Sequence, residues 1–156
     1  MNRLSAHTAL KVPVSHSAAP AVDWLNLDTC AALIITARGE RLARARSLWS
    51  ASCPGEQMIE IRFHHPTAVR RLRVVTTEAE QARTQEMTVW VSLHRGERHH
   101  HVLCQHFDFS PDGATEDVEE YALELEGVSA LQLRIVPSVD GRPATARVRE
   151  LRVASV

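Results

Sequence analysis

The sequence predicts an all-β protein, an antiparallel β-sandwich of jelly-roll type. Apolar and polar residues alternate with a period of two in successive short segments between Gln57 and Val136. This alternation is typical of a strand that covers a core with one face and meets water with the other. Turn sequences such as Ser110-Pro111-Asp112-Gly113 separate the segments. Strands that recur about every 10 to 15 residues indicate two stacked antiparallel sheets.

Eight segments carry the strand pattern, and the best alternation defines the predicted core. The strands are expected at 30–36, 57–63, 69–77, 85–93, 101–109, 118–125, 130–136 and 148–153, with a surface loop or one helical turn at 38–46. The side chains expected between the sheets are Ile59, Ile61, Phe63, Leu72, Val74, Val89, Val91, Leu123, Leu133 and Ile135.

The chain has 156 residues, which is enough for one domain with its own core. Residues 1–20 contain prolines and serines among alanines and predict a loosely ordered N-terminal arm, so that 21–156 form the single sandwich domain. The N-terminal segment lacks the apolar run of a signal peptide, and no stretch approaches the roughly 20 apolar residues of a membrane helix. Three cysteines without a CxxC pair favour a reduced, cytoplasmic setting.

Charge and motifs exclude several classes of function. The net charge of −1 and the isoelectric point near 6.8 give no global attraction to nucleic acid or to anionic membranes. The sequence contains no GxSxG, Walker loop, GxGxxG or HExxH motif. We therefore expect a protein that is not an enzyme, that uses no cofactor, and that binds neither nucleic acid nor membranes.

Five segments follow one another in a recognisable order: GEQMIEIRFHHPTAVRRLRVV (55–75), RTQEMTVWVSL (83–93), CQHFDFS (104–110), VEEYALELEGVSALQLRIVP (118–137) and ARVRELRV (146–153). Their order resembles the galactose-binding-like superfamily of β-sandwiches, the discoidin or coagulation-factor C-type modules. The resemblance runs from about Trp49 to Val153 and implies a non-catalytic binding module, most often for carbohydrate and sometimes for phospholipid or protein. It also implies a ligand surface built from loops at one end of the sandwich.

Modules of this kind often hold a structural calcium ion in the loop before the tryptophan. Here no aspartate occurs between Asp28 and Asp108, and the corresponding loop, ARGERLARARSLW (37–49), is rich in arginine. Calcium requires several oxygen ligands, which arginine does not supply. We therefore expect no calcium in this loop.

Trp49, Glu78 and Arg83 are the predicted ligand-binding residues. Sugars are bound by charged side chains that satisfy neighbouring hydroxyls and by an aromatic ring that stacks on the apolar face. The three residues supply these groups if their loops converge. In the alternative interpretation, Arg83 pairs locally with a glutamate and holds its loop in place.

Trp90 is predicted to project from the solvent face, because Met87, Val89 and Val91 take the inward positions of its strand. A large indole there indicates a contact with the N-terminal arm, a second copy of the chain, a protein partner or a sugar. With the outward Arg71 and Arg73, it forms the surface of a second hypothesis, a protein-interaction or homo-oligomer assembly module.

Histidines cluster at His99, His100 and His101, with His94 and His106 nearby. Strict alternation places His99 and His101 on one face and Cys104 and His106 on the opposite one. A zinc site needs three or four converging ligands, so we predict solvated imidazoles and no metal site. A transition-metal site and a pH-sensitive surface are the functional alternatives.

Overall fold

The computed structural model describes residues 2–5, 11–13, 21–35, 40–41, 49–93 and 99–156. These residues form ten strands in one antiparallel sheet and one short helix, and none of their helices is long and apolar enough to cross a membrane. The elements are β1 (Asn2–Ser5), β2 (Lys11–Pro13), α1 (Leu27–Cys30), β3 (Ala31–Ile35), β4 (Glu40–Arg41), β5 (Trp49–Ser50), β6 (Gln57–Thr77), β7 (Arg83–Leu93), β8 (His99–Phe109), β9 (Glu116–Val136) and β10 (Arg147–Ala154).

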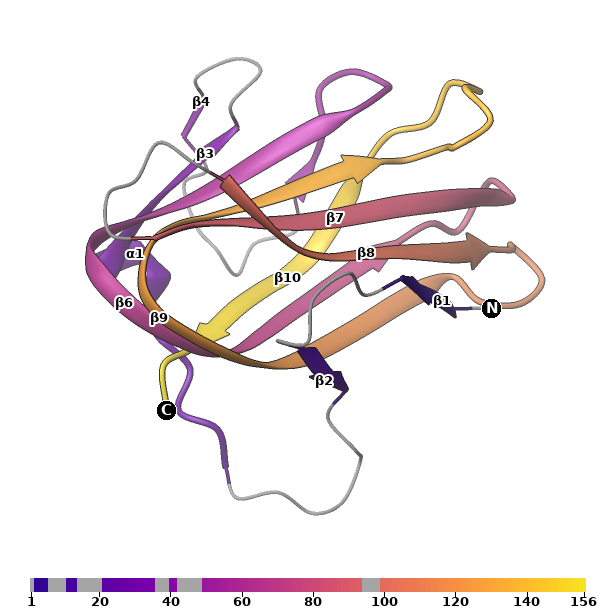
Figure 1. Ribbon diagram of the computed structural model, residues 1–156. Helices are drawn as coiled ribbons and strands as arrows, with labels where there is room; N and C mark the ends of the chain where they lie inside the picture. Colours follow the sequence, from indigo (N-terminus) through magenta and orange to yellow (C-terminus); the bar gives the residue numbers. More distant parts are fainter. Residues whose placement is uncertain (1, 6–10, 14–20, 36–39, 42–48, 94–98) are drawn as a thin grey trace.

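The sheet folds into two layers because β6 and β9 bend in the middle, and Figure 1 shows both strands curving at the left of the view. Residues 57–62 of β6 pair with 130–135 of β9, and residues 69–77 of β6 pair with 116–125. Several register shifts between Arg62 and Arg71 mark the corner, and Gly127 adopts a φ of 62° there. The sequence predicted 57–63 and 69–77 as two separate strands, and likewise 118–125 and 130–136. Bulges bend a strand without ending it, so each predicted pair is one continuous strand.

The first layer has the strand order β1-β8-β7-β9-β6-β3 and uses the second half of β9 and the first half of β6. The second layer has the order β2-β9-β6-β10-β5 and uses the other halves of the two long strands. All pairings are antiparallel. The predicted antiparallel β-sandwich is therefore confirmed.

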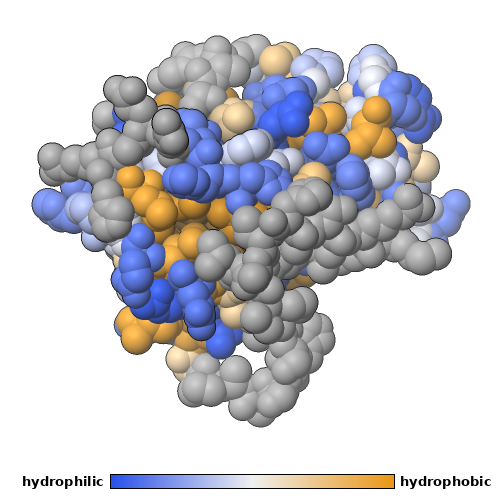
Figure 2. Space-filling view, viewed as in Figure 1, coloured by the Kyte–Doolittle hydropathy of each residue, from blue (hydrophilic) through white to orange (hydrophobic). Residues whose placement is uncertain are grey.

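The hydrophobic core lies between the two layers and confirms all ten predicted core residues. Each of them is buried, from Ile135 with 0% exposed surface to Phe63 with 6%. Tyr121 contributes one of the largest fully buried side chains. Figure 2 shows hydrophobic residues gathered at the left of the view with hydrophilic ones above and below them, as expected for two layers with polar outer faces.

Two segments of the N-terminal region pair with edges of the sheet. β1 pairs with β8 in the first layer, and β2 pairs with β9 in the second layer. The free N–H and C=O groups of an edge strand are able to pair with such extended segments. The prediction that residues 1–20 form a loosely ordered arm stays a prediction, because only 2–5 and 11–13 of them belong to the described residues. The loop 37–49, in which we expected no calcium, lies outside the described residues except for 40–41 and Trp49. His94 of the histidine cluster also lies outside them.

Candidate functional site

Trp90 lies on the outer face of the first layer, in a row of side chains that crosses four strands. The strand register places Glu60 of β6 opposite Gln132 of β9, Gln132 opposite Trp90 of β7, and Trp90 opposite His101 of β8. Trp90 is half-buried, whereas its neighbours Val89 and Val91 face the core. The predicted orientation of this strand is confirmed. We call Glu60, Gln132, Trp90 and His101 the Trp90 row.

Hydrogen bonds and a ring contact hold the Trp90 row in place. The His101 and Trp90 ring centroids lie 5.0 Å apart with an angle of 78° between the ring planes, which is an edge contact. Glu60 accepts a hydrogen bond from Gln132 Nε2 at 3.0 Å and one from Arg62 Nε at 2.7 Å. The row therefore presents an indole beside an amide and a carboxylate whose orientations are already fixed.

His99 extends this arrangement at the end of β8. Its Nε2 lies 3.4 Å from Gln132 Nε2, and its Nδ1 lies 2.6 Å from Ser92 Oγ. An amide nitrogen can only donate, so these two contacts fit the imidazole tautomer in which Nε2 accepts and Nδ1 carries the proton. The contacts thus join the end of β8 to the Trp90 row.

A bulge in β8 changes the faces predicted for the histidine cluster. Val89 pairs with Leu103, but Trp90 pairs with His101, so the register skips Val102. Strict alternation is lost at this point, and His101 joins Cys104 and His106 on the outer face. The prediction that Cys104 and His106 lie opposite His101 is therefore wrong.

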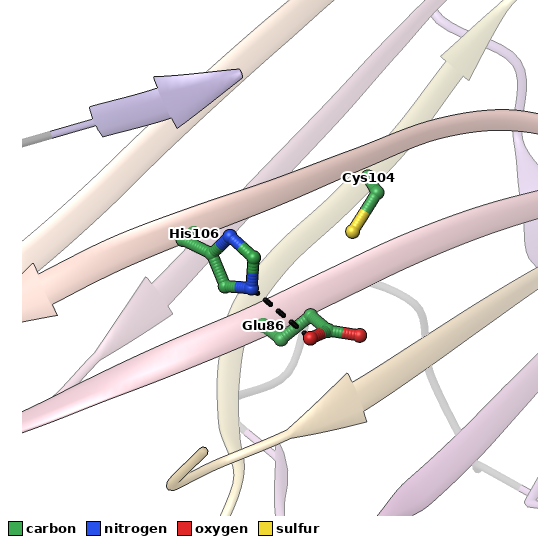
Figure 3. A group of neighbouring side chains, drawn as sticks. All are labelled: Glu86, Cys104 and His106. Carbon is green, nitrogen blue, oxygen red and sulfur yellow. Dashed lines mark hydrogen bonds and ion pairs between the residues drawn. The ribbon is translucent and has the colours of Figure 1, made fainter. Parts of the chain in front are cut away.

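The outer face also carries a group of donor atoms that are able to ligate a metal. Glu86 of β7 and Cys104 and His106 of β8 each offer one such atom, and these atoms lie within 4.8 Å of one another. Figure 3 shows the three side chains pointing toward one another. The sequence predicted no metal site, and this stays a prediction.

Glu78 and Arg83, two of the three predicted ligand-binding residues, are brought together but lie in the interior. Arg83 Nε donates to Glu78 Oε1 at 2.9 Å, and the exposed fractions of the two side chains are 0% and 5%. Local pairing of Arg83, the alternative that the sequence left open, is what the structure shows. Trp49 is partly buried and packs against the core. In this structure the three residues do not form an exposed sugar-binding surface.

Burial and pairing act in opposite directions on the pKa values of this ion pair. Burial alone would raise the pKa of Glu78, but the hydrogen bonds from Arg83 and from the Glu80 backbone, with the charges of Arg83 and Arg147, lower it overall. Burial lowers the pKa of Arg83, and Glu78 counteracts part of this shift. A guanidinium keeps its proton in proteins, so both partners are charged.

Arg71 and Arg73 do not share a surface with Trp90. They lie on the outer face of the second layer, where both pair with Glu120, at 3.2 Å and 3.1 Å. β6 passes from one layer to the other, so outward residues of its second half face away from those of β7. The predicted single surface of Trp90, Arg71 and Arg73 is therefore wrong.

The same outer face holds Trp24, a residue that sequence reasoning missed. The Arg152 guanidinium carbon lies 6.0 Å from the centroid of the Trp24 ring, and Arg152 Nε pairs with Glu150 at 2.5 Å. Trp24 precedes the first clear strand, so no alternating pattern marks it. Its backbone pairing with Ala154 places it beside β10.

A pair of carboxyl groups lies between the layers. Burial, a hydrogen bond with Glu119 and the charge of Glu119 raise the pKa of Asp117 to about 8. Burial and the charges of both acids also raise the pKa of Tyr121. Gln105 Nε2 donates to Glu119. Asp117 and Glu119 therefore share an interior polar environment, without access for a ligand from solvent.

No protein-family model and no curated protein matches the chain. Among solved structures, one similar chain is a pectin-binding carbohydrate-binding module, with 11% identity, coverage of 70% of this chain and 72% of that chain, and a TM-score of 0.49. Another is CpGH89CBM32-4 of Clostridium perfringens, in complex with GlcNAc-α-1,4-galactose, with 14% identity, coverage of 90% and 100%, and a TM-score of 0.50. The latter similarity shows the fold alone: the chain shares the β-sandwich of that module, in agreement with the fold that the sequence resemblance implied.

Proposed function

We propose that this chain is a non-catalytic carbohydrate-binding module and that the Trp90 row is its sugar-binding surface. The observation that carries the proposal is the row itself. It places an indole next to the amide of Gln132 and the carboxylate of Glu60, both oriented by hydrogen bonds. An aromatic face with a few fixed polar groups is the combination that binds a sugar ring and its hydroxyls.

The shared fold supports this proposal. CpGH89CBM32-4, which has the same sandwich, was solved with a bound disaccharide. Burial of Arg83 and Glu78 also supports the choice of surface, because it leaves these two predicted residues without exposed polar atoms for a sugar. The Trp90 row keeps its indole and the Gln132 amide half-buried on the outer face, and the Glu60 carboxylate beside them is buried, with 6% of the residue exposed.

A second function, protein interaction or assembly of copies of this chain, is favoured by one observation. Trp90 stands on a sheet face formed by β8, β7 and β9 rather than at the loops that end the sandwich. A flat sheet face with a central tryptophan also suits a protein contact, in which aromatic residues are enriched.

The two functions are separated by a glycan array and light scattering on the purified chain. For carbohydrate binding, we expect Trp90→Ala to abolish the array signal, and Trp24→Ala, which removes a half-buried indole from the opposite outer face, to leave it unchanged. Glycan binding that survives Trp90→Ala would refute the proposed surface. If no glycan binds and Trp90→Ala converts a dimer to a monomer, the assembly function replaces the proposal.

A further inference from the structure

We propose that Glu86, Cys104 and His106 form a binding site for a divalent transition-metal ion of the zinc type. Glu86 and His106 lie directly opposite each other on β7 and β8, and Cys104 is two positions before His106 on the same face. Figure 3 shows the sulfur, the imidazole and the carboxylate directed into one space. This inference does not depend on the proposed carbohydrate binding.

The distances fit a zinc site after small movements. Zinc lies about 2.3 Å from sulfur and about 2.0–2.2 Å from nitrogen or oxygen, so tetrahedral ligand atoms are about 3.4–3.6 Å apart. His106 Nε2 and Glu86 Oε2 are 3.0 Å apart, and no pair in the group exceeds 4.8 Å. Movements of about 1 Å at the ends of the side chains close the site around an ion of this size.

The donor set matches the charge and the chemical preference of zinc. A thiolate and a carboxylate together balance the double positive charge of the ion, and a neutral imidazole completes three ligands. Calcium and magnesium prefer oxygen ligands alone, so a site with sulfur and nitrogen selects against them. Three protein ligands leave a fourth position for water. The side chains of His106 and Glu86 are 33% and 27% exposed, so an ion can enter from solvent.

Neighbouring side chains orient the donors. Thr88 Oγ1 donates to Cys104 Sγ at 3.6 Å. Arg134 Nη1 lies 3.8 Å from Glu86 Oε1, which leaves Oε2 toward His106. The positive charge of Arg134 opposes a cation, but Arg134 is held mainly by Glu56, at 2.6 Å and 2.9 Å. Outer contacts of this kind fix ligand orientation in metal sites.

The test is a titration of the metal-free chain with Zn²⁺ by calorimetry, and with Co²⁺ by absorption spectroscopy. We expect one ion per chain and, with Co²⁺, a sulfur-to-metal charge-transfer band. Cys104→Ser should abolish the band and weaken Zn²⁺ binding by about 100-fold or more, and Thr88→Val should weaken it by about 10-fold.

Two variants serve as matched controls. His100→Gln removes an exposed histidine of the same strand, and Cys53→Ser removes a different free cysteine. Both should bind Zn²⁺ as the unmodified chain does. Circular dichroism of metal-free Cys104→Ser checks its folding, and Glu86→Gln provides a second ligand variant. The proposal fails if no metal binds, if Cys104→Ser and Glu86→Gln bind as tightly as the unmodified chain, or if His100→Gln removes binding.

Discussion

Arg83 and Glu78 are joined by an ion pair of 2.9 Å that is shielded from water at one end of the sandwich. Arg83 also donates from Nη1 to the Pro137 carbonyl at 2.5 Å and lies over the Phe109 ring, 4.7 Å from its centroid. Glu78 in turn accepts from Arg147 at 3.4 Å. One pair of side chains thus connects β7, β8 and β10 with the loops that follow β6 and β9.

We expect Glu78→Ala to lower the free energy of unfolding by about 3–5 kcal/mol, because it leaves the Arg83 charge buried without its partner. Glu120→Ala should cost about 1 kcal/mol or less, since Glu120 pairs with Arg71 and Arg73 on the surface. Urea denaturation of the three proteins measures both values. Equal losses in the two variants would show that burial does not determine the strength of the pair.

The Asp117 carboxyl predicts a pH dependence of stability. Its pKa is about 8 in the folded chain, against 3.8 as the ordinary value. Between these values the folded chain holds a proton that the unfolded chain has released, so the free energy of unfolding falls as pH rises from about 4 to about 8. Asp117→Asn keeps the shape of the protonated acid and should flatten this slope and stabilise the chain at pH 8.

The pH dependence is measured by denaturation between pH 4 and 9 in Asp117→Asn, with Asp112→Asn, at an exposed turn position, as the control. Only the first substitution should change the slope. If Asp117→Asn is less stable than the unmodified chain at pH 8 and leaves the slope intact, the buried carboxyl is ionised in the folded chain.

Gly127 lies at the corner of β9 with a positive φ, a backbone conformation that strains any other residue. Gly127→Ala should cost about 1–2 kcal/mol. Gly113→Ala should be nearly neutral, since Gly113 has no positive φ and an added Cβ would meet Ser110 at ordinary contact distances. Thermal unfolding measures both, and an unaffected Gly127→Ala would mean that the corner accommodates a side chain.

The sequence predicted which way side chains face but not which strands are neighbours. Alternation is a local property, so Leu133 and Trp90 were placed correctly on inner and outer faces. The position of Gln132 beside Trp90 depends on the pairing of β7 with β9, and this pairing is set by the order of strands in the sheet, which local alternation does not reveal. The bulge at Val102 and the passage of β6 between layers have no local signal, and they produced the errors at His101 and Arg73.

Substitutions on the inner and outer faces of the first layer should differ in their effect on stability. Leu133 lies in the core, so Leu133→Ala should cost about 2–5 kcal/mol through lost burial and the cavity that it leaves. Trp90→Ala removes nothing from between the layers and loses mainly the edge contact with His101, so it should cost about 1 kcal/mol. Guanidinium denaturation with circular dichroism measures both. If Trp90→Ala unfolds the chain, the indole supports the fold rather than a binding surface, and the proposed role of the Trp90 row fails with it.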